Sequence, residues 1–333
     1  MRRIISRTPV RISFFGGGTD YPAYYLRHPG AILGTTIDKY TYININTLSD
    51  FFDHKLRISY SKIELIRTLE EIQHPSVRGC LQHKGMFPKI DIHVSADLPA
   101  KTGLGSSSSF TVGFLNALYA LEGKKIGKQT LAQEACHVEQ QVIRENVGSQ
   151  DQFHAAFGGM NIMEFSASQI RVRPVIISPE KKELFQNHLL VFYTGLTRFA
   201  SEIVKEQIDK TQSLDNDSYL KRMYEMVFEA EGILSDATPH QMMPELGKLL
   251  NEGWSLKKQL SSKISNPTID AMYQMALQCG AYGGKLCGAG SGGFLALFVP
   301  PEAQPNVRAA LKDLLEVPVR FENEGSTIIY MKD

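Results

Sequence analysis

Apolar and polar residues alternate along several segments of the chain, a pattern typical of β-strands. In segment 90–96 the apolar positions are Ile90, Ile92, Val94 and Ala96, which is a period of two. Segments 4–15 and 36–48 are rich in β-branched and aromatic residues, which favour strands. Further strands are predicted over 56–60, 159–165, 170–175, 189–193, 294–299, 317–321 and 327–331.

Apolar residues spaced three and four apart predict helices between these strands. In segment 128–144, Leu131, Ala135, Val138 and Val142 form one apolar stripe. A short helix is expected to open at 148–152 and to end at Gly158. Other helices are predicted over 62–72, 77–83, 110–121, 198–212, 219–236, 239–263, 268–279 and 302–315.

The order of these elements favours an α+β fold. Strands and helices are mixed in the first half without the regular β-α-β alternation of a doubly wound parallel sheet. The chain has 333 residues, which is enough for two ordinary domains. We expect a boundary near 174–183, which divides the chain into domains of residues 1–175 and 176–333.

Composition narrows the class of protein and its partners. The net charge of +1 gives no general attraction to nucleic acid or to an acidic membrane surface. The four cysteines form no Cys-x-x-Cys pair, which fits a reduced protein better than a disulfide scaffold or a zinc site. No uncharged apolar run is long enough to span a bilayer, and no signal-type apolar run develops at the N-terminus. We therefore expect a soluble cytoplasmic protein with neither nucleic acid nor membrane partners.

A segment rich in glycine and serine, residues 98–110, lies between strand 90–96 and helix 110–121. Gly103 and Gly105 allow positive φ and close approach to a ligand. The free N–H groups at the following helix N-terminus, with four serine hydroxyls, suit a polyphosphate. The alternative is a flexible turn whose serines cap the helix, although capping needs one serine. The segment is not a P-loop, because no Gly-Lys-Ser/Thr follows.

Asp151 is the first candidate for catalysis. Ser149 and Gln152 match a Ser-x-x-Gln capping box, which would place Asp151 in the first turn of a helix. A helix N-terminus favours a charged carboxylate, and such a group can accept or orient a hydroxyl proton. The alternative is a surface aspartate that merely complements the helix dipole, and the local sequence does not decide between them.

Glu139 lies at the edge of the apolar stripe of segment 128–144. A carboxylate in that position needs a partner. Mg²⁺ is one option, because it takes oxygen ligands. A salt bridge to a nearby Arg or Lys is the other option, and the local sequence alone favours it.

A glycine turn, residues 16–20, lies between the first two apolar strands. Asp20 beside exposed backbone amides suits the recognition of sugar hydroxyls, whereas the alternative is a simple Asx turn. Arg11, just upstream, could stabilise charge on a moving phosphoryl group.

A second glycine loop, residues 288–293, matches Gly-x-Gly-x-x-Gly. It leads into a strand rather than following a strand and opening a helix, so we do not interpret it as a dinucleotide site. We interpret it as a loop that lets backbone approach the first site. Lys285, just before it, could meet a phosphate or could simply be solvated.

Taken in order, segments 9–21, 99–109 and 285–294 resemble the three motifs of the GHMP kinase family. The resemblance implies an N-terminal domain like domain 2 of ribosomal protein S5 and a C-terminal ferredoxin-like domain. It places the active site in the cleft between them. It implies that the phosphates of ATP are bound by Pro99, Lys101, Thr102, Gly103, Leu104, Gly105, Ser106, Ser107, Ser108 and Ser109.

The resemblance also implies roles for single residues. Asp151 matches the carboxylate that activates or orients the accepting hydroxyl, and Arg11 matches the basic residue of the first motif. Ser107 and Glu139 match the Mg²⁺ ligands, which reverses the local preference for a salt bridge at Glu139. The implied substrate-binding residues are Gly17, Gly18, Thr19, Asp20, Tyr21, Gly288, Ala289, Gly290 and Ser291. Two positions depart from the family pattern: Ser149 stands where relatives often have lysine, and Ser291 where they often have glycine.

Within the family, segments 14–22, 102–110, 150–152 and 193–198 look most like sugar 1-kinases that phosphorylate D-glycero-D-manno-heptose 7-phosphate. This implies Mg·ATP-dependent phosphorylation of the anomeric hydroxyl, giving the 1,7-bisphosphate used for nucleotide-activated heptose and surface glycans. A 7-phosphate needs a basic pocket, for which Lys39, Lys101 and Lys285 are candidates. Two alternative functions stay open: a kinase for fucose or another free sugar, and a catalytically silent sensor of sugar and ATP. A homodimer stays open as the oligomeric state.

Overall fold

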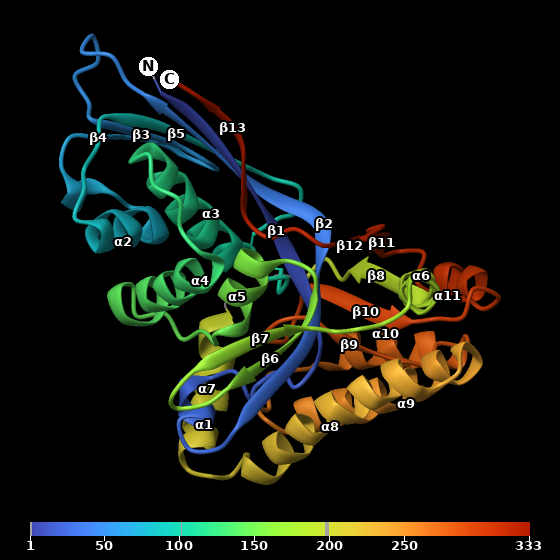
Figure 1. Cartoon of the computed structure of the whole chain (residues 1–333). Helices are drawn as coiled ribbons and strands as arrows, with labels where there is room; N and C mark the ends of the chain where they lie inside the picture. Colours follow the sequence, from blue (N-terminus) through green and yellow to red (C-terminus); the bar gives the residue numbers. More distant parts are fainter. Residues whose placement is uncertain (1, 101, 197–199) are drawn as a thin grey trace.

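The long antiparallel strands β1 and β2 run through the whole molecule in the computed structural model, which describes residues 2–100, 102–196 and 200–333 (Figure 1). They belong to a nine-stranded sheet of order β13-β1-β2-β5-β3-β4, in which β6 and β12 also pair with β2, and β7 pairs with β6. Its strands are β1 (Arg3–Phe15), β2 (Gly30–Thr47), β3 (Leu56–Ser59), β4 (Ile63–Ile66), β5 (Ile90–Ala96), β6 (Met160–Phe165), β7 (Ile170–Pro174), β12 (Phe321–Glu322) and β13 (Thr327–Lys332).

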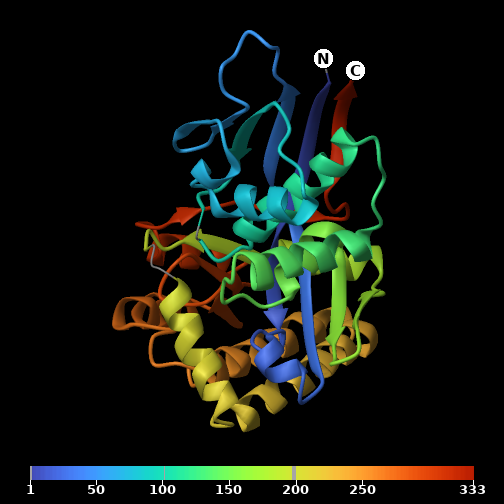
Figure 2. The same ribbon diagram turned by 90° about the vertical axis from the view of Figure 1, so that its left-hand side faces the viewer.

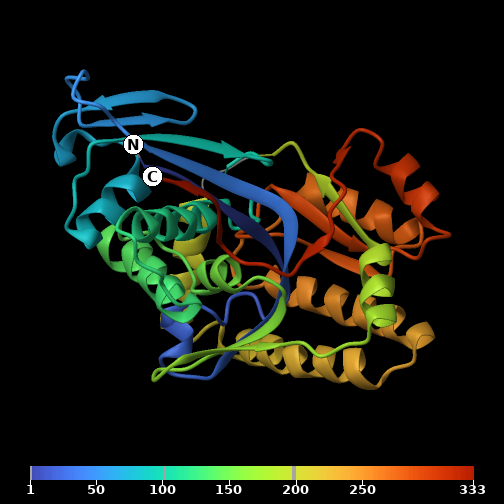
Figure 3. The same cartoon turned by 45° about the horizontal axis from the view of Figure 1, so that its top comes forward.

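Helices α2–α5 lie together on one side of this sheet (Figure 3). They are α2 (Pro75–Lys84), α3 (Ser106–Leu121), α4 (Lys128–His137) and α5 (Gln150–Phe157). Helix α3 is central and apolar on most of its surface, so that Phe114 and Leu118 are fully buried against Ile43 and Ile45 of β2. This core fixes the position of the α3 N-terminus, where the glycine- and serine-rich segment ends.

The second half of the chain builds a smaller antiparallel sheet of order β11-β8-β10-β9. Trp254 and the β10 residues Leu295 and Leu297 are buried in its core. The elements are α6 (Pro179–His188), β8 (Leu189–Tyr193), α7 (Ala200–Gln212), α8 (Asp217–Asp236), α9 (Pro239–Lys257), α10 (Pro267–Gln278), β9 (Gly283–Leu286), β10 (Phe294–Phe298), α11 (Gln304–Ala310) and β11 (Leu315–Glu316).

One apolar cluster joins the two sheets. The ring of Phe14 on β1 lies 4.9 Å from that of Phe185 on α6 and 5.6 Å from that of Phe298 on β10, measured between centroids. Val10 and Ile12 of β1 are buried in the same cluster. Strand β1 therefore holds both halves of the molecule, and the residues at its end lie where the halves meet.

The C-terminal segment returns to the first sheet. Strand β13 pairs with β1, with Lys332 opposite Arg3, so that the two chain ends lie side by side (Figures 1 and 2). Strand β12 pairs with β2. Residues 321–332 thus join the nine-stranded sheet although they lie far beyond residue 175. The boundary at residue 175 stays a prediction.

Several predicted elements differ from the structure. The helix predicted over 62–72 is wrong: buried Glu64 and Ile66 alternate with exposed Ile63 and Leu65, so the segment forms β4, followed by a short 3₁₀ turn. Helix 239–263 ends at 257, and helix 302–315 covers only 304–310. Of the predicted strand 317–321 only Phe321 is in a strand, as the first residue of β12. Helix 110–121 begins four residues earlier, and strand 36–48 begins at residue 30.

Other elements were missed or lie partly outside the description. The short helix α1 (Pro22–Tyr25), helix α6 and strand β9 were not predicted. Helix 128–144 ends as an α-helix at residue 137 and continues as one π-helical turn over 138–142. The start of predicted helix 198–212 lies outside the described residues. In the part of the chain that the structure describes, no helix is long and apolar enough to cross a membrane.

Candidate active site

The glycine- and serine-rich segment forms the N-terminal end of helix α3. Gly105 is the N-cap residue with φ of 79°, and the serines form the first helical turn rather than a loop. Ser107 is exposed and Ser106 partly exposed, whereas the hydroxyls of Ser108 and Ser109 point inward, donating to Glu139 Oε2 (2.8 Å) and to the carbonyl of Thr8 (2.9 Å). Two of the four predicted hydroxyls are therefore engaged inside the protein.

Other residues predicted for phosphate binding shape the loop. Thr102 is buried and its hydroxyl donates to the carbonyl of Pro99 at 2.9 Å. Leu104 is buried in the cluster that joins the two sheets, and its carbonyl accepts the N–H of Arg11 at 2.9 Å. Lys101 lies outside the described residues, as do positions 197 and 198 of the predicted motif 193–198.

Asp151 lies beside this helix end. Its Oδ2 is 3.2 Å from the position that a Cβ on Gly105 would occupy. Arg11, on β1, donates from Nε (2.8 Å) and pairs through Nη2 (2.7 Å) with Oδ1 alone, and its Nη1 donates to the carbonyl of Gly103 at 2.7 Å. The two predicted catalytic residues are thus in contact, and Oδ2 has no hydrogen-bond partner among the described residues.

The predicted capping box at this helix is wrong in its hydrogen bonds. Asp151 is in the first turn of α5 as expected, but Ser149 makes no side-chain cap. Ser149 is fully buried, and its hydroxyl lies 3.1 Å from Gln140 Nε2 and 3.2 Å from the hydroxyl of Tyr25. Gln152 donates to Glu139 instead. Position 149 therefore has an inward-facing hydroxyl, and the positive charge beside Asp151 comes from Arg11.

Glu139 lies in the single π-helical turn that follows α4, and it is 1% exposed. Its Oε2 accepts hydrogen bonds from Ser108 and Gln152, whereas its Oε1 has no partner of good geometry among the described residues. Burial raises the pKa of Glu139 to about 7, although the polar side chains of Thr111, Ser108 and Gln152 oppose the rise. The predicted salt-bridge alternative is wrong within the described residues, where Glu139 forms no ion pair.

Asp20 lies at the base of the glycine turn and is 1% exposed. Its Oδ1 accepts the N–H of Gly18 at 3.1 Å, and its Oδ2 accepts Gln150 Nε2 at 3.0 Å. Burial, and then the charge of Asp151, raise the pKa of Asp20. The carboxylates of Asp20 and Asp151 therefore belong to one electrostatic site.

The other residues of this turn differ in what they can offer a ligand. Thr19 is buried, and its hydroxyl donates to the carbonyls of Gly16 and Ala31, so it stabilises the turn rather than facing a substrate. Tyr21 is partly exposed, and burial of its hydroxyl together with the charge of Asp20 raises its pKa.

Two buried lysines adjoin the turn. Lys285, on β9, was singled out in the sequence, whereas Lys257, in the last turn of α9, was not. They are 8% and 7% exposed. A signal for Lys257 does exist, because it continues the buried positions Leu246, Leu250 and Trp254 at helical spacing.

The second glycine loop connects β9 to β10, so it does follow a strand, contrary to our prediction, and it packs against the first loop. A Cβ on Gly288 would lie 2.4 Å from the Cα of Gly103, and one on Gly103 would lie 2.4 Å from the carbonyl oxygen of Cys287. The predicted close approach of the two loops is confirmed. Ser291 is buried with φ of 60°, and its hydroxyl donates to the carbonyl of Lys263, so its side chain holds the loop rather than facing a ligand.

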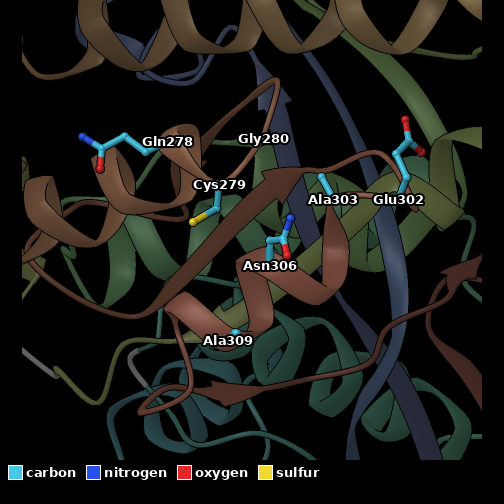
Figure 4. Close-up of a pocket in the computed structure, with 7 residues that line it drawn as sticks. All are labelled: Gln278, Cys279, Gly280, Glu302, Ala303, Asn306 and Ala309. Atoms are coloured by element: carbon cyan, nitrogen blue, oxygen red, sulfur yellow. The ribbon is translucent and has the colours of Figure 1, made fainter.

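A separate surface hollow of about 700 Å³ lies between the end of α10 and α11 (Figure 4). None of the residues predicted for the site lines it. Its lining residues are Gln278, Cys279, Gly280, Glu302, Ala303, Asn306 and Ala309.

Comparison with known proteins gives this arrangement a family. Residues 56–159 match the family described as GHMP kinases N terminal domain, and residues 234–317 match GHMP kinases C terminal. Together the two matches cover more than half of the chain. The chain belongs to the GHMP kinase family. The predicted α+β fold of this family and the predicted enzyme class, a phosphotransferase with an alcohol group as acceptor, are confirmed.

Individual relatives agree with this assignment. The kinase is 29% identical over 325 residues to D-glycero-alpha-D-manno-heptose 7-phosphate kinase of Campylobacter jejuni, covering 94% of each chain. It is 26% identical to the bifunctional fucokinase/GDP-fucose pyrophosphorylase of Arabidopsis thaliana, covering 97% of this chain and 32% of that protein. A crystal structure of a D-glycero-D-manno-heptose 1-phosphate kinase from Bacteroides thetaiotaomicron matches all of both chains with a TM-score of 0.80 at 22% identity, which supports the fold.

The geometry suits the chemistry of a GHMP kinase. Phosphoryl transfer from ATP asks a protein mainly to position two reactants and to stabilise charge. The N-terminus of α3 offers free N–H groups and partial positive charge to phosphate oxygens. Asp151 presents a free oxygen at that same place, and Arg11 supplies a fixed cation.

Proposed function

We propose that this GHMP kinase transfers the γ-phosphoryl group of ATP to the anomeric hydroxyl of D-glycero-D-manno-heptose 7-phosphate, giving the 1,7-bisphosphate. The likeness over nearly the whole chain to the Campylobacter jejuni heptose 7-phosphate kinase supports this substrate. The product would serve the synthesis of nucleotide-activated heptose for surface glycans.

One observation carries the catalytic part of the proposal: the free Oδ2 of Asp151 lies at the mouth of helix α3. In our proposal the phosphates of ATP bind at that mouth, and the acceptor hydroxyl approaches Oδ2. Asp151 orients this hydroxyl and accepts its proton as the oxygen attacks phosphorus. Arg11 holds the carboxylate through Oδ1 and offsets the negative charge on the transferring group.

Mg²⁺ is the cation we propose for the nucleotide. The residues fit it, because Glu139 has a buried carboxylate oxygen without a partner and Ser107 offers an exposed hydroxyl in the same region of α3. Bound there, the ion would neutralise phosphate charge. Ser108, rather than Ser107, donates to Glu139 in the structure, so Ser107 as a ligand stays a prediction.

The proposal is tested by measuring ATP consumption with heptose 7-phosphate, L-fucose and D-galactose as separate acceptors, followed by ³¹P NMR of the product. We expect turnover with heptose 7-phosphate and a new phosphoryl signal at the anomeric carbon. Faster turnover with fucose would favour a free-sugar 1-kinase, to which the Arabidopsis fucokinase likeness points. Binding of sugar and ATP without any product would show a non-catalytic sensor.

We also propose a cytoplasmic location, because the four cysteines are all free in the structure, as expected under reducing conditions. A homodimer remains a proposal from the sequence.

A further inference from the structure

The two buried lysines beside the glycine turn have no role in the mechanism above. Lys257 reaches the turn from the end of α9, and Lys285 reaches it from β9. Both are less than one-tenth exposed. Lysine is almost never fully buried unless its charge is paired, so two together need an explanation.

Neither ammonium group is saturated by the protein. Lys257 Nζ donates to Gln207 Oε1 at 3.0 Å, and Lys285 Nζ donates to the carbonyl of Phe14 at 3.3 Å. Each ammonium has three donors, so two on each lack a partner among the described residues. Neither lysine forms an ion pair with any of these residues.

The Lys285 ammonium lies beside Gly17, and Gln207, the partner of Lys257, lies beside Gly18. A Cβ built on Gly17 would lie 3.7 Å from Lys285 Nζ and 4.0 Å from the hydroxyl oxygen of Ser13. That hydroxyl is buried and has no partner among the described residues. A Cβ on Gly18 would lie 3.1 Å from Nε2 of Gln207, the residue that accepts from Lys257.

The charges around this turn do not balance. Arg11 is paired with Asp151, which leaves Lys257 and Lys285 to share Asp20. Burial is the main cause that lowers the pKa of each lysine to about 8, and the charge of Lys285 contributes to the fall at Lys257. Holding two like charges together in the interior is costly, and a bound anion would compensate for it.

We propose that Lys257, Lys285 and Ser13 form a binding site for the phosphate of a phosphorylated sugar, at the end of the acceptor site away from Asp151. This inference rests on the proposed function, which it deepens by naming the residues that select a sugar phosphate over a free sugar. Asp20 interacts electrostatically both with Asp151 and with the two lysines, and in our proposal it lies between the reacting end and the phosphate end. Asp20 and Gln150 would then meet the hydroxyls between the two ends.

The test compares kcat/KM for D-glycero-D-manno-heptose 7-phosphate with that for the unphosphorylated heptose. The wild-type ratio should be well above one. In Lys257→Met and Lys285→Met, which keep most of the side-chain volume, the ratio should fall about 10- to 100-fold, as expected for a lost hydrogen bond to a charged group. Ser13→Ala, a smaller change that the fold tolerates more easily, should lower the ratio in the same direction.

The matched control is Lys258→Met, because Lys258 neighbours Lys257 but forms a salt bridge with Asp270 at 3.2 Å. It should leave the ratio unchanged. A wild-type ratio at or below one, or an equal fall in Lys258→Met, would overturn the phosphate site while leaving the kinase activity standing.

A second measurement does not depend on turnover. Inorganic phosphate is titrated calorimetrically into enzyme whose nucleotide site is filled by a non-hydrolysable ATP analogue. Wild type and Lys258→Met should bind it, and Lys257→Met and Lys285→Met should bind it at least tenfold more weakly. If wild type phosphorylates no sugar, the proposed function fails and this titration decides the phosphate site by itself; equal binding by all variants would overturn it.

Discussion

Arg11 contacts Asp151 through two nitrogens, Nε and Nη2, and both contact the same carboxylate oxygen, Oδ1. The other oxygen, Oδ2, is free at the mouth of α3. Asp151→Asn should keep the shape of the side chain but remove its ability to accept a proton. We expect kcat to fall by about 10²- to 10⁴-fold, the usual range for a general base, with ATP affinity little changed. Steady-state kinetics and nucleotide titration measure the two quantities.

The matched control for Asp151→Asn is Glu180→Gln, which also removes a first-turn helix carboxylate, at an exposed position on α6. It should leave kcat unchanged. Near-normal turnover of Asp151→Asn would remove Asp151 from the proposed role.

Glu139 makes stability depend on pH. Its pKa rises from an ordinary 4.5 to about 7 on folding, so the folded chain holds this proton more tightly than the unfolded chain. The folded state therefore loses stability, relative to a chain without the group, as pH rises from 4.5 to 7. At about 1.4 kcal/mol per pKa unit, the loss approaches about 3 kcal/mol.

Glu139→Gln should abolish this dependence. Between pH 5 and pH 8, urea unfolding without Mg²⁺ should show the variant gaining about 2.5 kcal/mol relative to wild type. A constant difference between the two proteins at both pH values would contradict the raised pKa.

The role of a single residue could be predicted only where a motif or a local pattern indicated it. Asp151, Glu139 and Arg11 follow from motif positions, and the structure brings Arg11 and Asp151 into contact. No role could be predicted for Lys257 from the sequence. Its role depends on the elements that lie near it, β9 and the glycine turn, and the sequence does not show that these are its neighbours. The hydrogen bonds of Ser149 and Gln152 were predicted wrongly, because Glu139 on another helix competes for Gln152.

At the scale of elements, the loop that contains Gly103 and the loop of residues 288–293 pack against each other through their backbones. Gly288→Ala would place a Cβ 2.4 Å from the Cα of Gly103 and would also require a side chain at φ of 81°. We expect a loss of about 1 to 3 kcal/mol in unfolding free energy from backbone strain. Because the displaced loop is the one at which we propose that ATP binds, kcat/KM for ATP should also fall, by up to about 10²-fold.

Gly127→Ala is the control for this prediction, since a Cβ there meets nothing within 4 Å. It should cost at most about 1 kcal/mol as a change at a helix N-cap and should not change kcat/KM for ATP. Equal effects of both substitutions would show that loop contact does not position the nucleotide.

Element types were predictable where periodicity was long, and failed where tertiary contacts chose between alternatives. Segment 62–72 is too short for its apolar periodicity to decide, and the pairing of residues 63–66 with β3 makes them a strand. The helix that carries Glu139 was predicted as regular. In the structure Glu139 lies in a π-helical turn and contacts Ser108 and Gln152, and no local pattern contains these contacts.

For the molecule as a whole, the sequence predicted two domains but not how closely their structures interlock. Strands β12 and β13 come last in the chain yet complete the first sheet. The apolar cluster around Phe14 also draws on both halves. Pairings between segments some 300 residues apart leave no periodic signal, so the sequence could not show them.

This interlocking predicts that the two halves unfold together. Trp254 is the single tryptophan of the chain and reports on the C-terminal half, whereas Cys80 is buried in the core of the first sheet. In urea, tryptophan fluorescence and the reaction of the Cys80 thiol with a thiol reagent should give the same midpoint, because the apolar cluster around Phe14 on β1 joins the two halves. A variant with the other three cysteines replaced by alanine or serine isolates the Cys80 signal. Midpoints separated by more than the error of the fits would show that the halves fold independently and that β1 does not couple them.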